Sequence, residues 1–352
     1  MVIERFIQMM IEKEASDLFL RVATPPKARI YGEVMSLDEK PLSSEEMNRI
    51  VEEVAGKSFL SDLERNKNYE RGLWFRDNWR LRVSVFYQRN TLAMVIRKID
   101  LNISSFEALN LPTKVLQDLC RQKRGMVLLT GTTGSGKSTA IASMIDYINS
   151  NFRRHILSIE EPIEFTFTDK KSIVTQREIG KDVESYQEAL RQFALHSPDV
   201  IYIGNIRDEA TMQAALMAAD AGVLVFSTIH TVNAPQTIDR ILSFFPPYQH
   251  NFVLLQLSQL LRGVVSLRLL PRQDAKGLIP AYEIMTLSPS ISRLIREGKL
   301  WEILRYIEEG EIYGMTSFEQ VLLRLVKEGK ISVDTALSFS DRKEELRMKL
   351  DK

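Results

Sequence analysis

A glycine-rich segment near the middle of the chain carries the clearest chemistry. Its glycines allow successive backbone N–H groups to turn inward around phosphates at the start of a helix, where the helix dipole favours anions. Its lysine can reach the β- and γ-phosphates of ATP, and the serine that follows can ligate Mg²⁺ together with waters. The residues, which have the spacing of a P-loop, are Gly131, Thr132, Thr133, Gly134, Ser135, Gly136, Lys137, Ser138 and Thr139. An apolar strand is expected before the segment and a helix after it, so a nucleotide site is a better explanation than a chance glycine-rich turn.

Three carboxylates follow the next apolar strand. Glu160, Glu161 and Glu164 lie within the segment Ser158–Phe165. In isolation, a solvated acidic loop would be the better interpretation. In a doubly wound sheet, however, the carboxyl ends of the strands line the ligand crevice. We therefore expect at least one of the three to face the nucleotide, where it could polarise water or hold the hydration shell of the metal.

Two further strands end in polar residues. The apolar run Val200–Ile203 leads into Gly204, Asn205 and Arg207, the position of a Walker B group. A later strand ends in His230, which is the only one of the four histidines at such a strand end. A single histidine is more often structural, but at this position we expect it to sense the γ-phosphate.

The elements that would position these residues alternate between strands and longer helices, which is typical of a parallel sheet covered on both faces. After Pro271 the chain is expected to be mostly helical, with helix starts at 288–291 and 315–319. The expected strands are Met126–Thr130, Ile156–Ile159, Val200–Ile203 and Val223–Ser227, and the expected helices are Lys137–Asn149, Tyr186–Leu195, Glu209–Ala221 and Ala234–Leu242.

The first hundred residues predict a separate mixed α/β module. An amphipathic helix should begin near Ile3, strands should cover Asp17–Val22 and Lys27–Val34, and a second helix should open at Ser43–Glu46. The segment Trp79–Phe86 alternates with period two.

Three arginines belong to this module. Arg80 and Arg82 share the polar face of the alternating strand, and Arg97 lies on the expected partner strand Ala93–Arg97. A solvated sheet face would explain any one of them. Three on one small sheet make a functional role about equally plausible.

Composition narrows the class of protein. The 352 residues include 44% hydrophobic and 26% charged residues, and a chain of this length is expected to form two domains. A net charge of +1 lacks the basic excess of nucleic-acid-binding proteins. The single cysteine, Cys120, excludes an internal disulfide and a four-cysteine zinc site and fits a reducing compartment. No apolar run is long enough for an integral membrane segment, so a cytoplasmic protein is expected.

Four segments occur in a fixed order: the P-loop at 131–139, the acidic segment at 158–165, the Walker B segment at 199–208 and the histidine segment at 227–231. Together they resemble the secretion ATPase superfamily, and in particular the type IV pilus retraction ATPases. The resemblance covers nearly the whole chain, since residues 16–18 and 80–83 also match the family's first domain. Pilus-assembly and secretion ATPases of the superfamily usually carry a four-cysteine insertion that this chain lacks. Residues 290–297, SISRLIRE, are similar to the AIRNLIRE signature of the retraction branch, and residues 314–320 fit the same branch.

This resemblance implies an α/β fold with three parts. Residues 1–100 would form an N-terminal PAS-like domain, 101–112 an interdomain linker, and 113–352 a RecA-like P-loop ATPase domain with a helical C-terminal region. It implies a homo-hexamer in which Arg82 and Arg97, with Arg80 as a further candidate, reach the phosphates bound by another subunit. The partner would be an inner-membrane pilus platform protein, with the motor peripheral at that membrane and driving pilus retraction and twitching motility.

One departure from the family pattern concerns the Walker B box, which normally reads Gly-Glu-x-Arg-Asp. Here Asn205 replaces the glutamate, and an amide can hold a water molecule but cannot accept its proton. An active retraction motor in which Glu161 or Glu164 compensates is one hypothesis. The alternative is an ATP-binding regulatory subunit of low turnover that works with a paralogous retraction ATPase. A nucleic-acid translocase is disfavoured by the near-neutral charge.

Overall fold

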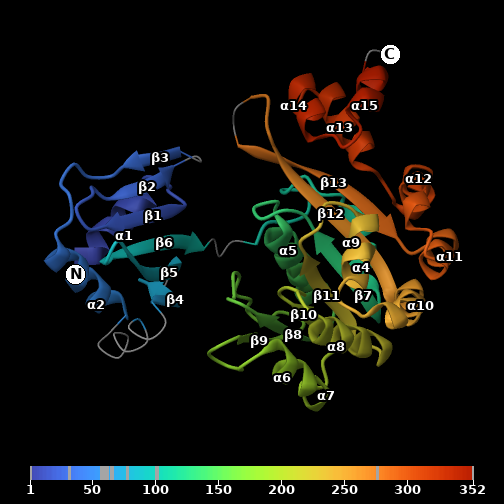
Figure 1. Ribbon diagram of the computed structural model, residues 1–352, viewed down its shortest axis with the longest axis horizontal. Helices are drawn as coiled ribbons and strands as arrows, with labels where there is room; N and C mark the ends of the chain where they lie inside the picture. The colour runs from blue at the N-terminus through green and yellow to red at the C-terminus, as the bar shows by residue number, and fades with distance from the viewer. Residues whose placement is uncertain are drawn as a thin grey trace. The chain divides into compact units, whose positions relative to one another are not determined.

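The computed structural model describes residues 2–30, 33–55, 63, 67–76, 79–99, 103–274 and 277–350. The chain divides into two compact units, Met1–Asn102 and Ile103–Lys352. Among the described residues, no helix combines the length and the apolar character needed to cross a membrane. Strands and helices alternate in the second unit, and the predicted α/β fold class is confirmed (Figure 1).

The first unit contains a six-stranded antiparallel sheet in the order β3-β2-β1-β6-β5-β4. The apolar positions of its first helix, including Ile3, Phe6 and Met10, are buried, as helical spacing predicts. Leu81 and Val83 on β5 are also buried, whereas Arg82 between them is half-buried, so the period-two prediction is confirmed. The elements are α1 Val2–Glu12, β1 Asp17–Arg21, β2 Lys27–Ile30, β3 Glu33–Ser36, α2 Ser44–Ala55, β4 Asn68–Phe75, β5 Trp79–Gln88 and β6 Thr91–Ile99.

The second unit contains a seven-stranded sheet in the order β13-β12-β7-β11-β10-β8-β9. Every neighbouring pair is parallel except β12 with β13. The strands are β7 Gly125–Thr130, β8 His155–Glu160, β9 Ile173–Glu178, β10 Val200–Ile203, β11 Leu224–Ile229, β12 Leu261–Pro271 and β13 Leu278–Thr286. The helices up to β12 are α4 Thr113–Arg121, α5 Lys137–Asn151, α6 Tyr186–Arg191, α7 Phe193–His196, α8 Glu209–Asp220, α9 Ala234–Leu242 and α10 His250–Leu260.

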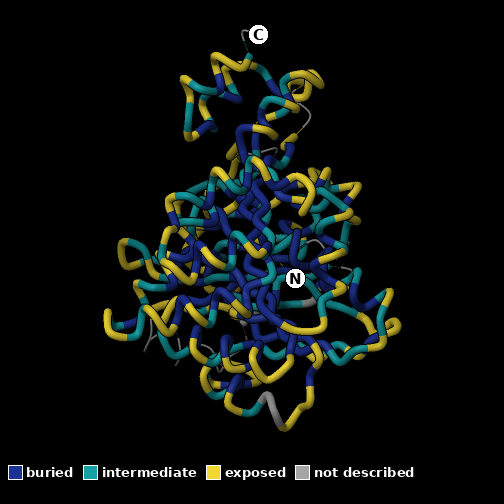
Figure 2. The backbone as a smooth tube through the Cα atoms, turned by 90° about the vertical axis from the view of Figure 1, so that its right-hand side faces the viewer, coloured by how far each residue is buried: buried dark blue, intermediate teal, exposed yellow. Residues whose placement is uncertain are grey.

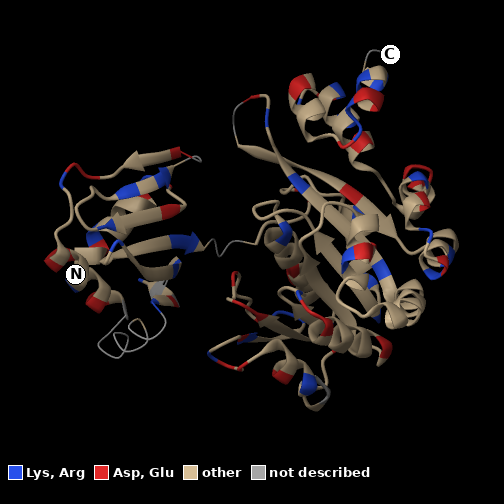
Figure 3. Ribbon diagram, in the orientation of Figure 1, with Lys and Arg blue, Asp and Glu red and all other residues tan. Residues whose placement is uncertain are grey.

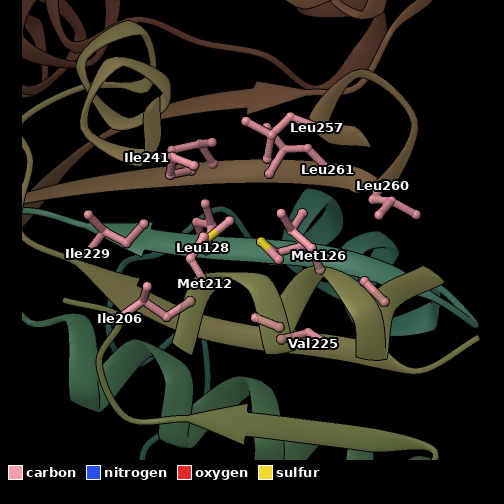
Figure 4. Packing of buried hydrophobic residues seen from close by; sticks show 14 of the residues in the cluster. Met126, Leu128, Ile206, Met212, Val225, Ile229, Ile241, Leu257, Leu260 and Leu261 are labelled. Carbon is pink, nitrogen blue, oxygen red and sulfur yellow. The ribbon is translucent and has the colours of Figure 1, made fainter. Parts of the chain in front are cut away.

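Hydrophobic cores lie on both faces of this sheet, and β7 contributes to each of them. Met126 and Leu128 belong to the core on one face, while Val127 and Leu129 belong to the core on the other. Figure 4 shows the first pair in one cluster with Met212 of α8. Figure 2 shows that buried stretches of the chain alternate with exposed turns. A strand buried on both faces explains why β7 is an uninterrupted apolar run.

The C-terminal region begins with α11 Pro289–Glu297, which buries Ile291, Leu294 and Ile295. Both predicted helix starts are confirmed. The Ser288 side chain caps α11, and Ser317 forms a capping box with Gln320 at the start of α13. The remaining helices are α12 Ile303–Glu308, α13 Phe318–Lys327, α14 Val333–Phe339 and α15 Lys343–Leu350, with short 3₁₀ turns at Pro247–Gln249, Leu300–Glu302 and Glu311–Tyr313.

Two expectations about single elements were wrong, and the region after Pro271, which is mostly helical as expected, also contains a strand. The single strand expected over Lys27–Val34 is two antiparallel strands, β2 and β3. The helix expected over Tyr186–Leu195 is divided into α6 and α7, because Gln192 ends the first of them. The region after Pro271 includes β13, which contains Pro280. A proline argues against a strand, but an edge strand such as β13 tolerates the missing N–H.

Candidate nucleotide-binding site

Four strand ends bring the candidate residues together. In the sheet, β7, β11, β10 and β8 are neighbours and run in parallel, so their carboxyl ends meet at one edge. The P-loop follows Thr130, the histidine follows Ile229, the Asn205 turn follows Ile203, and the acidic segment begins at Glu160. The sheet therefore brings these four segments to the same end of its parallel strands in the second unit.

The P-loop has the backbone that the motif requires. Gly131 has φ = 142°, in the region that favours glycine, and a methyl group added there would lie only 2.5 Å from the carbonyl oxygen of Leu267. Lys137 begins α5, and its Nζ donates hydrogen bonds of 2.8 Å to the carbonyls of Gly131 and Thr132. Burial lowers the pKa of Lys137, while the Glu164 carboxylate opposes that shift. The ammonium group is thus held inside the curve of the loop.

Two buried polar atoms of the described residues lack a hydrogen-bond partner, and both lie in the segments that form this crevice. They are Oγ of Ser135 in the P-loop and Oδ1 of Asn205 after β10. Buried polar groups are nearly always paired, so an unpaired one is a place where a ligand or a water molecule can bind. The residues present therefore fit a bound nucleotide with its associated water.

The turn that carries Asn205 is held by hydrogen bonds to three residues of other segments. The N–H of Gly204 donates to the Ile159 carbonyl over 2.8 Å, and its carbonyl accepts from Thr228 Oγ1 over 2.7 Å. The hydroxyl of Tyr186, the first residue of α6, accepts a hydrogen bond from the N–H of Asn205. Sequence reasoning assigned no role to Tyr186, and nothing in the spacing of α6 marks it.

The three carboxylates occupy different environments. Glu160 is only 5% exposed, and its Oε1 accepts hydrogen bonds from Ser158 Oγ at 2.7 Å and Gln176 Nε2 at 3.2 Å. Burial raises the pKa of Glu160 to about 7, against those two hydrogen bonds. Glu161 is exposed and Glu164 is half-buried. Glu164 is the carboxylate whose charge reaches Lys137, and it also contributes to the raised pKa of Glu160.

We expect Glu160→Gln to stabilise the protein at alkaline pH. The shift from 4.5 to about 7 corresponds to about 3 kcal/mol, because one pKa unit is worth about 1.36 kcal/mol. The contribution of the carboxyl group to stability is complete below pH 4.5 and is lost as the pH rises through about 7. The free energy of unfolding should therefore rise by about 3 kcal/mol at pH 8 and by no more than about 1 kcal/mol at pH 5.

Urea unfolding followed by circular dichroism at the two pH values measures this difference. The matched control is Glu161→Gln, which removes an exposed carboxylate and should change stability little at either pH. An equal gain from Glu160→Gln at pH 5 and pH 8 would contradict the raised pKa.

His230 is exposed at the end of β11. Partial burial of the ring is the largest cause that lowers the pKa of His230, and the positive charges of Lys137 and Arg207 lower it further. The imidazole is therefore neutral near pH 7 and can donate one N–H to a phosphate oxygen. Arg207 is a second group to which sequence reasoning gave no role, although it follows the same strand as Asn205.

A Mg²⁺ ion would fit this site only if waters and the nucleotide phosphates supplied most of its ligands. Ser138, half-buried at the second position of α5, is the predicted protein ligand. Across the described part of the chain, no cluster of three His, Cys, Asp or Glu side chains could hold a metal. Mg²⁺ typically keeps several waters and binds substrate phosphates with one or two protein ligands, so a single hydroxyl suffices.

The candidate arginines lie in the first unit. Arg82 on β5 is directly opposite Arg97 on β6. Like charges opposite each other destabilise a sheet, and here each has a carboxylate partner: Arg82 pairs with Glu70, and Arg97 Nε lies 2.7 Å from Asp17 Oδ1. Figure 3 shows basic and acidic segments interspersed on these strands. The register places the two residues opposite each other, and each guanidinium group pairs with a carboxylate of the strand on its other side, Glu70 of β4 or Asp17 of β1.

Comparisons with known proteins agree on the family to which this chain is similar. A family model described as type II/IV secretion system protein matches residues 1–279. The type IV pilus ATPase PilU of Pseudomonas aeruginosa is 39% identical over 98% of this chain and 90% of its own length. The pilus retraction ATPase PilT of the same organism is 37% identical over 92% of this chain and 93% of its own length.

A solved structure extends the similarity to three dimensions. The crystal structure of the pilus retraction motor PilT with bound ADP has a TM-score of 0.91 and 40% sequence identity. The match covers 98% of this chain and 99% of that one. The similarity thus includes the first unit and the C-terminal helices as well as the P-loop.

Proposed function

Because the chain belongs to the type II/IV secretion system protein family, we propose that it is an ATP-binding subunit of a pilus retraction motor. The observation that carries this proposal is the P-loop, in which Lys137 is held between the carbonyls of Gly131 and Thr132. Relatives that are similar over nearly the full length and are named as retraction ATPases or motors support the assignment of the process.

Each candidate residue at this site would have its own role in ATP binding or hydrolysis. Lys137 neutralises the β- and γ-phosphates, and His230 donates a hydrogen bond near the γ-phosphate. A Mg²⁺ ion, when bound through Ser138 and waters, supplies further neutralisation of charge. Asn205 orients the attacking water through its amide. The proton acceptor would then be Glu164, because its charge reaches Lys137 while Glu160 is fastened to Ser158 and Gln176.

A second candidate function is favoured by one residue. Asn205 occupies the place where the family carries a glutamate, and its buried Oδ1 cannot take a proton from water. The chain would then bind ATP and assemble but turn over slowly, acting as a regulatory subunit beside an active paralogue. The similarity to PilU and PilT at comparable levels is compatible with either role.

The proposed function also implies an oligomeric state and a location in the cell. We infer a homo-hexamer in the cytoplasm, peripheral at the inner membrane, where it acts on a pilus platform protein. The opposed Arg82 and Arg97 of one subunit would contact the phosphates bound by another.

Lys137→Ala should weaken ATP binding by at least about 100-fold, because no other cation of the P-loop can replace the ammonium group at the phosphates. Isothermal titration calorimetry with ATP and Mg²⁺ measures the change. Lys123→Ala, at an exposed lysine just before β7, is the matched control and should bind like the parent. Unchanged affinity in Lys137→Ala would refute the P-loop assignment.

The process itself is tested in cells that carry this chain. Deleting the gene should leave pili extended and abolish surface motility, and the parent gene should restore motility. Lys137→Ala should not restore it. Normal motility after deletion would argue against a retraction role even if ATP binding were confirmed.

A further inference from the structure

A buried carboxylate on β13 lies at the start of α9, the helix that follows the histidine segment. Glu283 is only 2% exposed, and its Oε1 accepts a hydrogen bond of 2.8 Å from the backbone N–H of Ala234. The helix α9 begins at Ala234 and packs against β12 and β13 (Figure 1). Glu283 belongs to none of the four nucleotide-binding segments, so their motifs do not account for a carboxylate buried there.

Glu283 completes the hydrogen bonding at the start of α9. The first N–H groups of a helix have no partner within the helix itself. In α9 the N–H of Gln236 donates to the Asn233 side chain at 3.0 Å, and Pro235 has no N–H. Among residues 234–236, the N–H of Ala234 is the remaining one, and it donates to Glu283. Without this acceptor a buried N–H would lose its partner, which costs stability at the start of the helix.

The bond to Glu283 holds one end of the segment that carries His230. The strand β11 ends one residue before His230, and α9 begins four residues after it. Val232, within this short connection, lines a cavity of about 410 Å³ together with residues 131–135 of the P-loop. The sheet therefore fixes one end of the connection and Glu283 fixes the other, beside the loop that would bind the phosphates.

The register of the sheet places Glu283 in one row with the start of the P-loop. Glu283 on β13 is opposite Ser266 on β12, and Ser266 is opposite Thr130 at the end of β7. Thr130, which directly precedes the P-loop, donates a hydrogen bond of 2.9 Å from its Oγ1 to Ser266 Oγ. Residues opposite each other share a face of the sheet. The carboxylate that holds α9 is therefore anchored in the same row of the sheet as the residue before the P-loop.

Glu283 can accept the bond from α9 in either protonation state. Burial is the largest cause that raises the pKa of Glu283 to about 7, and the charges of Glu319 and Asp341 act in the same direction. The N–H of Ala234 and the guanidinium group of Arg268 oppose the shift. Since the carboxyl group is partly neutral near pH 7, α9 requires an acceptor oxygen at this distance from β13 rather than a full negative charge.

We propose that Glu283 is a positioning residue for His230: by accepting the hydrogen bond at the start of α9, it holds the histidine segment where the imidazole can contact the γ-phosphate. This inference rests on the proposed function, because it assumes that the P-loop binds ATP and that His230 reaches its third phosphate. Glu283 acts through the helix and not on the P-loop. Its effect should therefore be confined to nucleotides that carry a γ-phosphate.

Glu283→Asp should raise the Kd for ATP about tenfold while leaving the Kd for ADP unchanged. The shorter side chain withdraws the acceptor from Ala234, and a hydrogen bond to a charged phosphate is worth about tenfold or more in binding. Glu283→Gln keeps the length and an acceptor oxygen, so it should bind both nucleotides like the parent. Calorimetry with Mg²⁺ on the full chain measures both Kd values. The matched control is Glu319→Asp, which shortens a buried carboxylate of α13 that pairs with Arg342 and should change neither value.

A double variant tests whether Glu283 acts through the histidine. His230→Ala alone should also raise the Kd for ATP about tenfold, and adding Glu283→Asp to it should cause no further loss. A second measurement uses the unmodified chain: amide hydrogen exchange over residues 229–242 should slow more with ATP than with ADP, because the γ-phosphate then holds the same segment.

Three outcomes would overturn the positioning role while leaving the proposed function intact. They are equal losses of ATP and ADP affinity in Glu283→Asp, a further tenfold loss of ATP affinity in the double variant, and equal protection of residues 229–242 by the two nucleotides. A parent that binds neither nucleotide would overturn the proposed function as well, which separates the two failures.

Discussion

Replacing Asn205 with glutamate should raise steady-state ATP turnover by about 100-fold or more. General-base catalysis is typically worth about 10²–10⁴-fold in rate, and a carboxylate at this position would take the proton of the attacking water. The backbone of the turn is held through Gly204, Thr228 and Tyr186, so the new side chain should enter the crevice where the amide now lies. Phosphate release from saturating ATP and Mg²⁺ measures the gain.

The matched control is Asn205→Gln, which has the length of glutamate without its charge and should show no gain. A large gain restricted to glutamate would favour the low-turnover regulatory subunit. If instead the parent already hydrolyses ATP at a rate typical of motors and loses it in Glu164→Gln, the base lies in the acidic segment and the low-turnover hypothesis is wrong. Glu161→Gln in the same background distinguishes the two remaining carboxylates.

In the Asn205→Glu background, Arg82→Ala should reduce turnover by about 10³–10⁵-fold, the range measured for arginines that reach a phosphoryl group from another subunit or protein. The register of the sheet holds Arg82 opposite Arg97, and within this chain each of them is paired with a carboxylate. Arg49→Ala, at an exposed arginine of α2, serves as the control and should retain turnover.

Mixing tests whether the arginine acts between subunits. Arg82→Ala and Lys137→Ala subunits are each inactive alone, but a mixed ring contains sites that pair an intact P-loop with an intact Arg82. Turnover should therefore recover in part when the two are combined. No recovery, together with a single-chain mass by sedimentation in the presence of ATP, would contradict shared sites.

The parts of the site that follow apolar strands could be predicted from the sequence. Lys137, Glu160, Asn205 and His230 each come within two residues of a strand end or begin the helix after one, and parallel strands bring such residues to one edge. The prediction used only local pattern and a general rule of α/β sheets.

Residues that arrive from distant elements could not be predicted. Tyr186 of α6 interacts with Asn205, which follows β10, and no local pattern in the sequence brings these two residues together. Phe339 lines the same cavity as residues 131–135, and its carbonyl accepts a hydrogen bond from Arg268 of β12, which no local pattern encodes. The strand β13 was missed for a different reason, since Pro280 is disfavoured in a strand unless the strand lies at an edge.

The turn at Asn205 also bears on how such proteins diverge. Its known anchors are backbone groups of Gly204, Asn205 and Ile206, bonded to Ile159, Thr228 and Tyr186, and none of them uses the side chain at position 205. A change of this one side chain therefore leaves these hydrogen bonds of the turn intact. Among duplicated copies, one could then keep a residue that supports ATP hydrolysis while another carries a residue that does not. The hydrogen bonds of the turn permit this difference because they do not involve the side chain at position 205.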